Sequence, residues 1–387
     1  MNILKLKGVT LLMALSIAIA GCSSKKSDTP TVLTIPVKIG VIAPLTGAEA
    51  AYGEAVKSVL DMAVEGINAQ VAKSGGKIEL VYEDGKCEEK SALAAAQKLV
   101  AKDAVKFIIG GICNIETIAA ASFTEVNHVI LVSPGSRSPR IGLAGDHVFR
   151  TIPSNEGGAK KLAGYVIDKK YTKVGIISEQ DNDTVGARVA FEEHLRTANI
   201  NAIAQNYAST EKDVKGHLLK LKNNKIEALL INPATAEKGD VILKQLKEIN
   251  FKPQLLLAGA LGHSNKVLGS QKEFVEGAIT ADMVTSDSFA KFAGEYQIKY
   301  GKSIDQETVG AAAYDALMIL RDAIAKNGID PDKVMAHLLT LKDYKGMTGT
   351  FGFDPNGEPT TVLGLYMIQE GKRVALGANN ASPKVAP

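Results

Sequence analysis

The fold is decided by the stretch Val37-Lys38-Ile39-Gly40-Val41-Ile42-Ala43-Pro44-Leu45-Thr46-Gly47. Its β-branched run stops at a proline and a glycine, and apolar side chains then recur at helical spacing from Val56 to Ile67. This pattern predicts a strand, a loop and a helix. In an open α/β sheet, the loop that leaves the carboxyl end of a strand faces the ligand crevice. We therefore expect a small molecule at the loop from Leu45 to Tyr52; a βα turn without a ligand is the alternative.

The same alternation of strands and helices continues in two series. The first ends near Ser133, and the second runs from about Ser154 to Ala258. Strands separated by helices of about ten to fifteen residues predict right-handed βαβ units and parallel sheets. A chain of 387 residues is too long for one ordinary core. We therefore predict the α/β class, with two doubly wound parallel-sheet lobes.

The last part of the chain predicts a hinge. Beyond Asp282, three predicted helices follow one another without strands, so we expect them to pack on the first lobe. The chain would then cross between the lobes three times, and hinged lobes can close over a ligand. The predicted domains are residues 36–152 with 284–352 for lobe 1, and residues 153–283 with 353–378 for lobe 2.

The N-terminal residues predict export. Lys5 and Lys7 precede an apolar run from Val9 to Ala20, which is too short to span a bilayer and is typical of a secretory signal. The run ends in Ile19-Ala20-Gly21-Cys22, which resembles the lipobox of bacterial lipoproteins, where the cysteine receives lipid. We expect residues 1–21 to be the signal peptide and residues 22–35 a tether to a bacterial membrane. An ordinary cleaved signal followed by a chance cysteine is the alternative.

The cysteine count agrees with export. After Cys22, the two remaining thiols, Cys87 and Cys113, form an even pair in a compartment that permits disulfides, so we predict that they are bonded. A metal site is the competing interpretation, but the sequence has no Cys-x-x-Cys and its six histidines are scattered. We predict no metal.

Composition and motifs exclude several functions. The net charge is only +3, and no basic run with interleaved aromatic residues is present, so we expect no nucleic-acid partner. The chain has no Walker-type phosphate loop and no His-Glu-x-x-His motif. Gly262-His263-Ser264-Asn265 begins like a nucleophile elbow, but Lys266 stands where the second glycine is needed. We therefore predict neither an enzyme nor a cofactor.

An ordered series of short motifs resembles the branched-chain amino-acid (leucine/isoleucine/valine) binding proteins. The motifs extend over residues 36–376 and include Pro44-Leu45-Thr46-Gly47, Ala51-Tyr52-Gly53, Gly110-Gly111-Ile112-Cys113, Ser133-Pro134-Gly135 and Gly349-x-Phe351-Gly352-Phe353-Asp354. The resemblance implies a type I periplasmic-binding fold, a Cys87–Cys113 disulfide and a small-molecule solute. It also implies permease and ATPase subunits of an ABC importer as partners; we expect a monomer.

Loops of both lobes supply the candidate solute-binding residues, which are Tyr52, Asn114, Ile115, Ser136, Arg137, Asp183, Thr184, Ala234 and Leu261. In the similar receptors, hydroxyl groups and backbone amides hold an α-carboxylate, an acidic residue meets the ammonium, and tyrosines line the pocket. Tyr52 matches this pattern. Four positions depart from it. Asn114 stands where the receptors have a serine, and Arg137 where they have a threonine. Asp183 stands where they have a tyrosine, and Leu261 where they have the ammonium-binding glutamate.

These departures leave three interpretations of the site. Arg137 could take a carboxylate by two parallel hydrogen bonds while Asp183 takes an amine. Arg137 could instead hold an organic acid against Leu261. Both side chains could also lie in solvated loop tips or pair with each other. We expect the solute to be an amino acid, an amide or an organic acid, and the alternative function is a ligand-sensing or envelope-partner lipoprotein without transport.

Overall fold

The computed structural model describes residues 32–304 and 306–376. The predicted signal peptide and the lipidation at Cys22 lie outside these residues. The described end of the predicted tether is already part of the fold, because Leu33 is 2% exposed in the core and its carbonyl accepts a hydrogen bond from Ser74 Oγ at 2.8 Å. Among the described residues, no helix has the length and apolar character needed to cross a membrane.

Sheet A consists of five parallel strands in the order β2-β1-β3-β4-β5. Its strands are β1 (Pro36–Ala43), β2 (Lys77–Asp84), β3 (Phe107–Gly110), β4 (Ile130–Ser133) and β5 (Val148–Arg150). Alternate side chains point to opposite faces of a strand. On β3, Phe107 and Ile109 accordingly join one apolar cluster, whereas Ile108 joins another.

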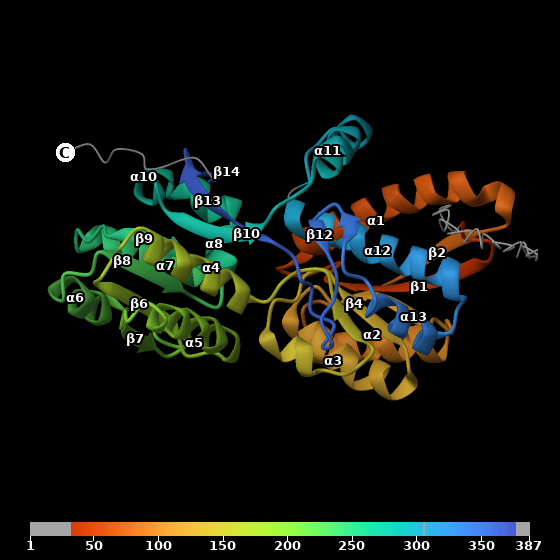
Figure 1. Ribbon diagram of the computed structural model, residues 1–387, viewed down its shortest axis with the longest axis horizontal. Coiled ribbons are helices and arrows are strands. Elements are labelled where there is room, and N and C mark those ends of the chain that lie inside the picture. The colour runs from red at the N-terminus through yellow and green to blue at the C-terminus, as the bar shows by residue number, and fades with distance from the viewer. Residues whose placement is uncertain (1–31, 305, 377–387) are drawn as a thin grey trace, which may run out of the picture. The chain divides into compact units, whose positions relative to one another are not determined.

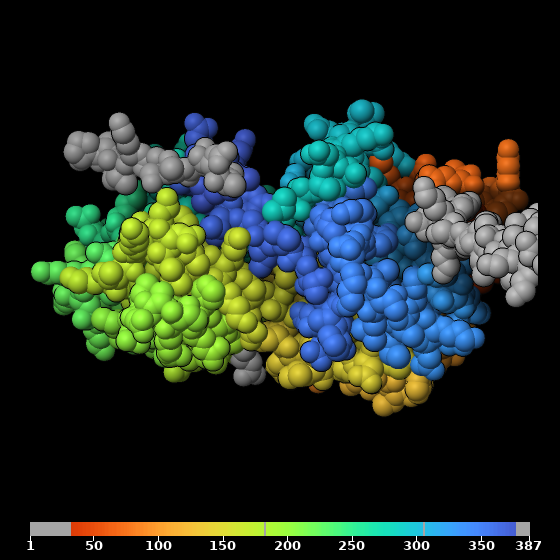
Figure 2. All heavy atoms as spheres, viewed as in Figure 1, coloured from red at the N-terminus to blue at the C-terminus, as the bar shows by residue number. Residues whose placement is uncertain are grey.

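Helices cover both faces of sheet A (Figure 1). One face packs against α1 (Ala50–Val71), α12 (Glu307–Asn327) and α13 (Pro331–Leu338), and the other against α2 (Glu89–Ala101) and α3 (Asn114–Thr124). Helix α11 (Asp287–Tyr300) packs on α1 and α12 through Phe289, Phe292 and Tyr296. The prediction that the late helices pack on the first lobe is confirmed. Figure 2 shows the blue surface of these C-terminal residues beside the orange and yellow surface of the first half of the chain.

Sheet B has seven strands in the order β14-β13-β10-β9-β8-β6-β7. Strands β6 to β10 are parallel, and β13 and β14 are antiparallel additions at one edge. The strands are β6 (Val174–Glu179), β7 (Ile203–Tyr207), β8 (Ala228–Asn232), β9 (Gln254–Leu257), β10 (Ile279–Met283), β13 (Leu363–Gln369) and β14 (Lys372–Ala375). The predicted α/β class with two wound sheets is confirmed, and sheet B is mixed because the chain returns to it as a hairpin.

Helices also cover both faces of sheet B. One apolar cluster joins the sheet to α4 (Asn155–Asp168) and α5 (Asn182–Arg196). The other joins it to α6 (Lys215–Asn223), α7 (Ala236–Glu248), α8 (Gly259–His263), α9 (Asn265–Ser270) and α10 (Lys272–Val275). Three 3-10 helices, η1 (Ala72–Ser74), η2 (Glu125–Asn127) and η3 (Pro139–Leu143), lie in connections of the first lobe.

The chain passes between the two sheets after β5, after β10 and before β13. The third passage lies later than predicted. Phe353 is fully buried in the first-lobe core, and the carbonyl of Gly357 accepts a hydrogen bond from Arg150 N at 3.1 Å. Residues 353–358 therefore pack with the first lobe, after the small hairpin of β11 (Tyr344–Gly346) and β12 (Gly349–Phe351). The other predicted domain boundaries stay a prediction.

Candidate functional site

The strand order reverses once within each wound sheet. In sheet A, β1 lies between β2 and β3, and in sheet B, β6 lies between β7 and β8. At such a switch point the following loops separate to opposite faces and leave a crevice at the carboxyl ends of the strands. The loops to consider are therefore those that follow β1, β3, β6 and β8.

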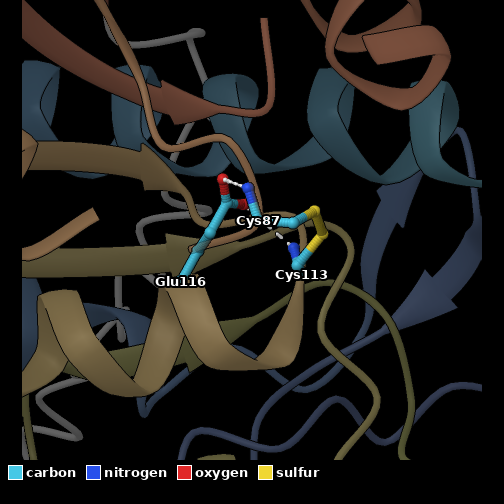
Figure 3. A group of neighbouring side chains, drawn as sticks. All are labelled: Cys87, Cys113 and Glu116. Atoms are coloured by element: carbon cyan, nitrogen blue, oxygen red, sulfur yellow. Dashed lines mark hydrogen bonds between the residues drawn. A yellow bond between two sulfur atoms is a disulfide. The ribbon is translucent and has the colours of Figure 1, made fainter. Parts of the chain in front are cut away.

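The loop after β3 is held by the buried carboxylate of Glu116. Its oxygens accept hydrogen bonds from Cys87 N at 2.9 Å and Cys113 N at 3.0 Å (Figure 3), and from Ile112 N at 2.9 Å. Burial raises the pKa of Glu116, and the three backbone donors act in the opposite direction. Cys87 and Cys113 form the predicted disulfide, with Cα atoms 5.4 Å apart. Glu116 and the disulfide thus fasten two loops at one end of sheet A.

Removing this disulfide should destabilise the protein without unfolding it. The bond closes a segment of 26 residues, so we expect the Cys87→Ser/Cys113→Ser variant to lose about 2–4 kcal/mol of unfolding free energy. Urea unfolding, followed by circular dichroism, measures the difference. Reducing the wild-type protein should reproduce the loss, whereas reductant should leave the double variant unchanged; equal stability of all forms would contradict a stabilising bond.

The loop after β4 is fixed from both sides. Asn114 Oδ1 accepts hydrogen bonds from Arg137 N at 2.8 Å and Ser138 N at 3.0 Å. Arg150, which is 1% exposed, donates from Nη1 to the carbonyls of Ser136 at 3.2 Å and Ser138 at 2.7 Å. The guanidinium of Arg150 also pairs with Glu358. These bonds therefore fix the backbone around Arg137 independently of the contacts of its side chain.

The second lobe holds a buried carboxylate at its own switch point. Glu179 ends β6, is 1% exposed, and accepts hydrogen bonds from Ala234 N at 2.9 Å and from Lys238 Nζ. Burial opposes ionisation of Glu179, but the hydrogen bonds from Lys238 and Ala234 outweigh it and lower its pKa. Asp181 caps α5, and Thr184 Oγ1 donates to the carbonyl of Glu179 at 2.6 Å. These contacts fix the start of α5.

Side-chain hydrogen bonds join the two lobes. Asn114 Nδ2 donates to Asp183 Oδ2 at 2.6 Å, which connects the β3 loop at one switch point to the β6 loop at the other. Arg137 Nη2 donates to Asp282 Oδ1 at 3.1 Å. Arg137 and Asp183 are thus neither solvated loop tips nor partners of each other.

Asp282, at the end of β10, is the centre of a charge cluster. Its carboxylate, 3% exposed, also accepts from Arg373 Nη1 at 2.7 Å and Thr308 Oγ1 at 2.9 Å, and His263 Nε2 lies 3.5 Å away. Burial opposes ionisation of Asp282, but the neighbouring positive charges outweigh it and hold its pKa well below the usual range. Burial together with the two arginines lowers the pKa of His263 to about 4, so this imidazole is neutral at pH 7.

Tyr52 lies near the same two arginines, Arg137 and Arg373. Burial raises the pKa of its phenol, as does the charge of Glu49, whereas Arg137 and Arg373 lower it. A cavity of about 10 Å³ lies beside Arg137 and His263, which is room for about one water molecule. A larger molecule beside Arg137 at this cavity would need the surrounding groups to move apart.

The structure brings together only part of the predicted residue set. Asn114, Arg137 and Asp183 meet at the polar links, with Tyr52 close to Arg137. The Oγ of Ser136 is buried 2.6 Å from Thr117 Oγ1, and Ile115 is 45% exposed on the first turn of α3.

Leu261 does not face this site. Its side chain is fully buried in the core between α7 and sheet B, where it lies against Gly239. The expectation that Leu261 would line the solute pocket is therefore corrected: an apolar side chain on the short helix α8 gains more from burial than from a polar crevice. His263, two residues further on, is the α8 side chain that reaches Asp282.

The sequence interpretation missed Asp282, Arg373 and Glu179. Asp282 and Arg373 lie 91 residues apart and meet only because β10, β13 and β14 are neighbours in sheet B. An acidic residue at the end of an apolar strand was the available signal for both Glu179 and Asp282, since a charge at the carboxyl end of a buried strand lies beside the crevice.

Two wound sheets with facing switch-point loops, joined by three passages of the chain, define the class of two-lobed solute-binding proteins. The chain belongs to the periplasmic binding protein family, whose model matches residues 36–373. The relatives that the chain matches over most of its length are binding proteins for small molecules.

Several relatives and solved structures are similar over most of the chain. The leucine-, isoleucine-, valine-, threonine- and alanine-binding protein of Pseudomonas aeruginosa is 28% identical over 352 residues, covering 89% of this chain and 91% of the relative. The leucine-binding protein LivK of Thermotoga maritima superposes with a TM-score of 0.77 at 24% identity, covering 88% and 97% of the two chains. A solute-binding protein of R. palustris in complex with 4-hydroxybenzoate gives a TM-score of 0.77 at 20% identity, covering 88% and 95%. The resemblance to the branched-chain amino-acid binding proteins is confirmed.

Proposed function

We propose that this protein captures a small polar solute between the loops of its two lobes and delivers it to the permease and ATPase of an ABC importer. Closure would follow from a higher affinity of the solute for the closed form than for the open form. The solute we propose is an amino acid, an amide or an organic acid.

One observation carries the proposal: the polar links between the lobes involve loops at the sheet ends where a ligand crevice is expected. Asn114 and Asp183 belong to the two switch points, and Arg137 and Asp282 lie beside them. These groups are mostly buried, and a buried charge must be paired. Arg137 would exchange its partner Asp282 for a group of the solute, while Asp282 would keep Arg373 and Thr308.

The chemistry of Arg137 favours a carboxylate on the solute. A guanidinium binds a carboxylate by two parallel hydrogen bonds, which gives both strength and orientation. The P. aeruginosa relative is named for five amino acids, and one similar solved structure contains 4-hydroxybenzoate; all of these carry a carboxylate. An amine on the solute would find Asp183 on the opposite side, which is the arrangement we expect for an amino acid.

The proposal includes a place in the cell. We propose that the mature chain begins at Cys22, carries lipid there, and is a monomer anchored to a bacterial membrane in the periplasm or at the cell surface. The apolar run and the lipobox-like Ile19-Ala20-Gly21-Cys22 support this. Metabolic labelling with a lipid precursor, compared between wild type and Cys22→Ser, tests it: label retained in the variant would contradict lipidation at this cysteine.

A screen of solutes by thermal shift should identify the ligand. A solute at about one hundred times its dissociation constant stabilises the folded protein by about 2.7 kcal/mol, which gives a clear rise in melting temperature. The panel would contain aliphatic amino acids, their amides and aromatic acids, with calorimetry on each positive. Binding of amines that lack a carboxylate, with no binding of any acid, would contradict the role proposed for Arg137.

A sensor or envelope-partner role on the same fold is the second candidate. It is favoured by the observation that Arg137 and Asp183 already have protein partners, so the lobes can be held together by side chains alone. If no solute shifts the melting temperature while an envelope protein binds to the purified chain, this second role replaces transport.

A further inference from the structure

A cluster of two histidines and an aspartate lies on the first lobe, outside the candidate solute site. His128 follows η2, His147 precedes β5, and Asp332 is in the first turn of α13. One possible ligand atom from each side chain lies within 4.8 Å of the other two. These residues come from three separate elements, so the cluster is made by the tertiary fold and not by a local repeat.

His147 is held in a fixed orientation. Its side chain is 6% exposed, and the Nδ1 atom lies 3.3 Å from Glu125 Oε1, while His147 N donates to Glu125 Oε2 at 3.0 Å. Gly145 packs against Glu125 so closely that an added Cβ would lie 2.2 Å from Oε2. Glu125 thus orients the ring from its Nδ1 side, and Nε2 faces Asp332.

The spacing of the ligand atoms suits a tetrahedral metal ion. Asp332 Oδ1 lies 2.9 Å from His147 Nε2 and 3.3 Å from His128 Nδ1. With zinc bonds of about 2.0–2.1 Å, tetrahedral ligands lie about 3.3 Å from one another. The two imidazole rings stand edge to face, with centroids 5.0 Å apart. Small rotations of the exposed His128 and Asp332 side chains would therefore complete three ligand positions.

We propose that His128, His147 and Asp332 bind a zinc ion, with water in the fourth position. Two imidazoles and one carboxylate are ligands that zinc accepts, whereas magnesium and calcium prefer oxygen alone. A carboxylate behind a ligating histidine, here Glu125 behind His147, is the usual outer partner of such sites. The ion would tie α13 to the edge of sheet A, because His147 directly precedes β5 and Asp332 belongs to α13.

Calorimetry with zinc chloride on untagged, EDTA-treated protein tests the site. We expect one zinc ion per chain, and a cobalt-substituted protein with the visible absorption of tetrahedral cobalt bound to nitrogen and oxygen. His128→Gln and Asp332→Asn should each weaken zinc binding at least tenfold. Both side chains are more than 60% exposed, so these variants should fold normally. Glu125→Gln should weaken binding about 10–100-fold through the orientation of His147.

His337→Gln is the matched control, because His337 lies in the last turn of the same helix, outside the cluster. It should bind zinc as the wild type does. A zinc isotherm that is unchanged in both His128→Gln and Asp332→Asn would overturn the proposal, as would the absence of zinc binding by the wild type. Solute binding should be the same with and without zinc, which separates this site from the one between the lobes.

Discussion

Replacing Arg137 by alanine is expected to abolish solute capture, with the dissociation constant rising at least one hundredfold. This rise corresponds to about 2.7 kcal/mol, as expected when a charge-assisted pair of hydrogen bonds to a carboxylate is lost. The loop itself should keep its shape, because Asn114 and Arg150 hold its backbone. Calorimetry with the solute found by the thermal-shift screen measures the effect.

Arg140→Ala is the matched control for this experiment. Arg140 is an exposed arginine three residues further along the same loop, so it reports the general effect of removing a positive charge there. The control should bind the solute with wild-type affinity. If Arg137→Ala retains that affinity too, then Arg137 serves only its ion pair with Asp282, and both interpretations that give it the solute carboxylate fail.

Replacing Asp282 by asparagine is expected to lower the unfolding free energy at pH 7 by about 3–5 kcal/mol. The neutral amide leaves Arg137 and Arg373 without their shared buried carboxylate, and an unpaired buried charge carries a penalty of this size. Urea unfolding at pH 7 measures the loss. The exposed Asp343, replaced by asparagine, is the control and should change stability by less than about 0.5 kcal/mol.

The difference in unfolding free energy between wild type and Asp282→Asn should become smaller as the pH falls below about 4. The pKa of Asp282 in the folded protein lies below its value of about 3.9 in the unfolded chain. Its ionisation therefore contributes stability that is fully present above about pH 4 and is lost as the pH falls further. A difference in unfolding free energy that grows as the pH falls from 5 to 3 would contradict this account.

Regular periodicity made most of the fold predictable, and the exceptions have physical reasons. Apolar spacing predicted α12 to within one residue at each end, because a long buried helix repeats its pattern many times. Strand β5 has only three residues, and the short strand β10 contains the charged Asp282, so neither was predicted from the sequence. The Phe351-Gly352-Phe353 motif indicated a passage between lobes, but both rings pack in the first-lobe core.

The candidate site was predictable by loop but not by side chain. Parallel topology located the loops after β3, β4 and β6, and with them Asn114, Arg137 and Asp183. Which atoms meet depends on contacts between distant parts of the chain, such as Thr308 with Asp282. No local spacing encodes such contacts. Leu261 shows the limit of a position inferred from a resemblance, since its own chemistry placed it in the core.

The bonds that shape the loops around Asn114 and Arg137 have a kinetic consequence. Glu116, the Cys87–Cys113 disulfide and the Arg150 guanidinium all belong to the same lobe as these loops, so the bonds that they make do not require the partner lobe. An arriving solute would thus dock onto a surface that is already assembled, and contacts that link the lobes, among them Asn114–Asp183, Arg137–Asp282 and Thr308–Asp282, would need to re-form or change. Association rates should then be nearly insensitive to substitutions in the second lobe, whereas residence times should shorten.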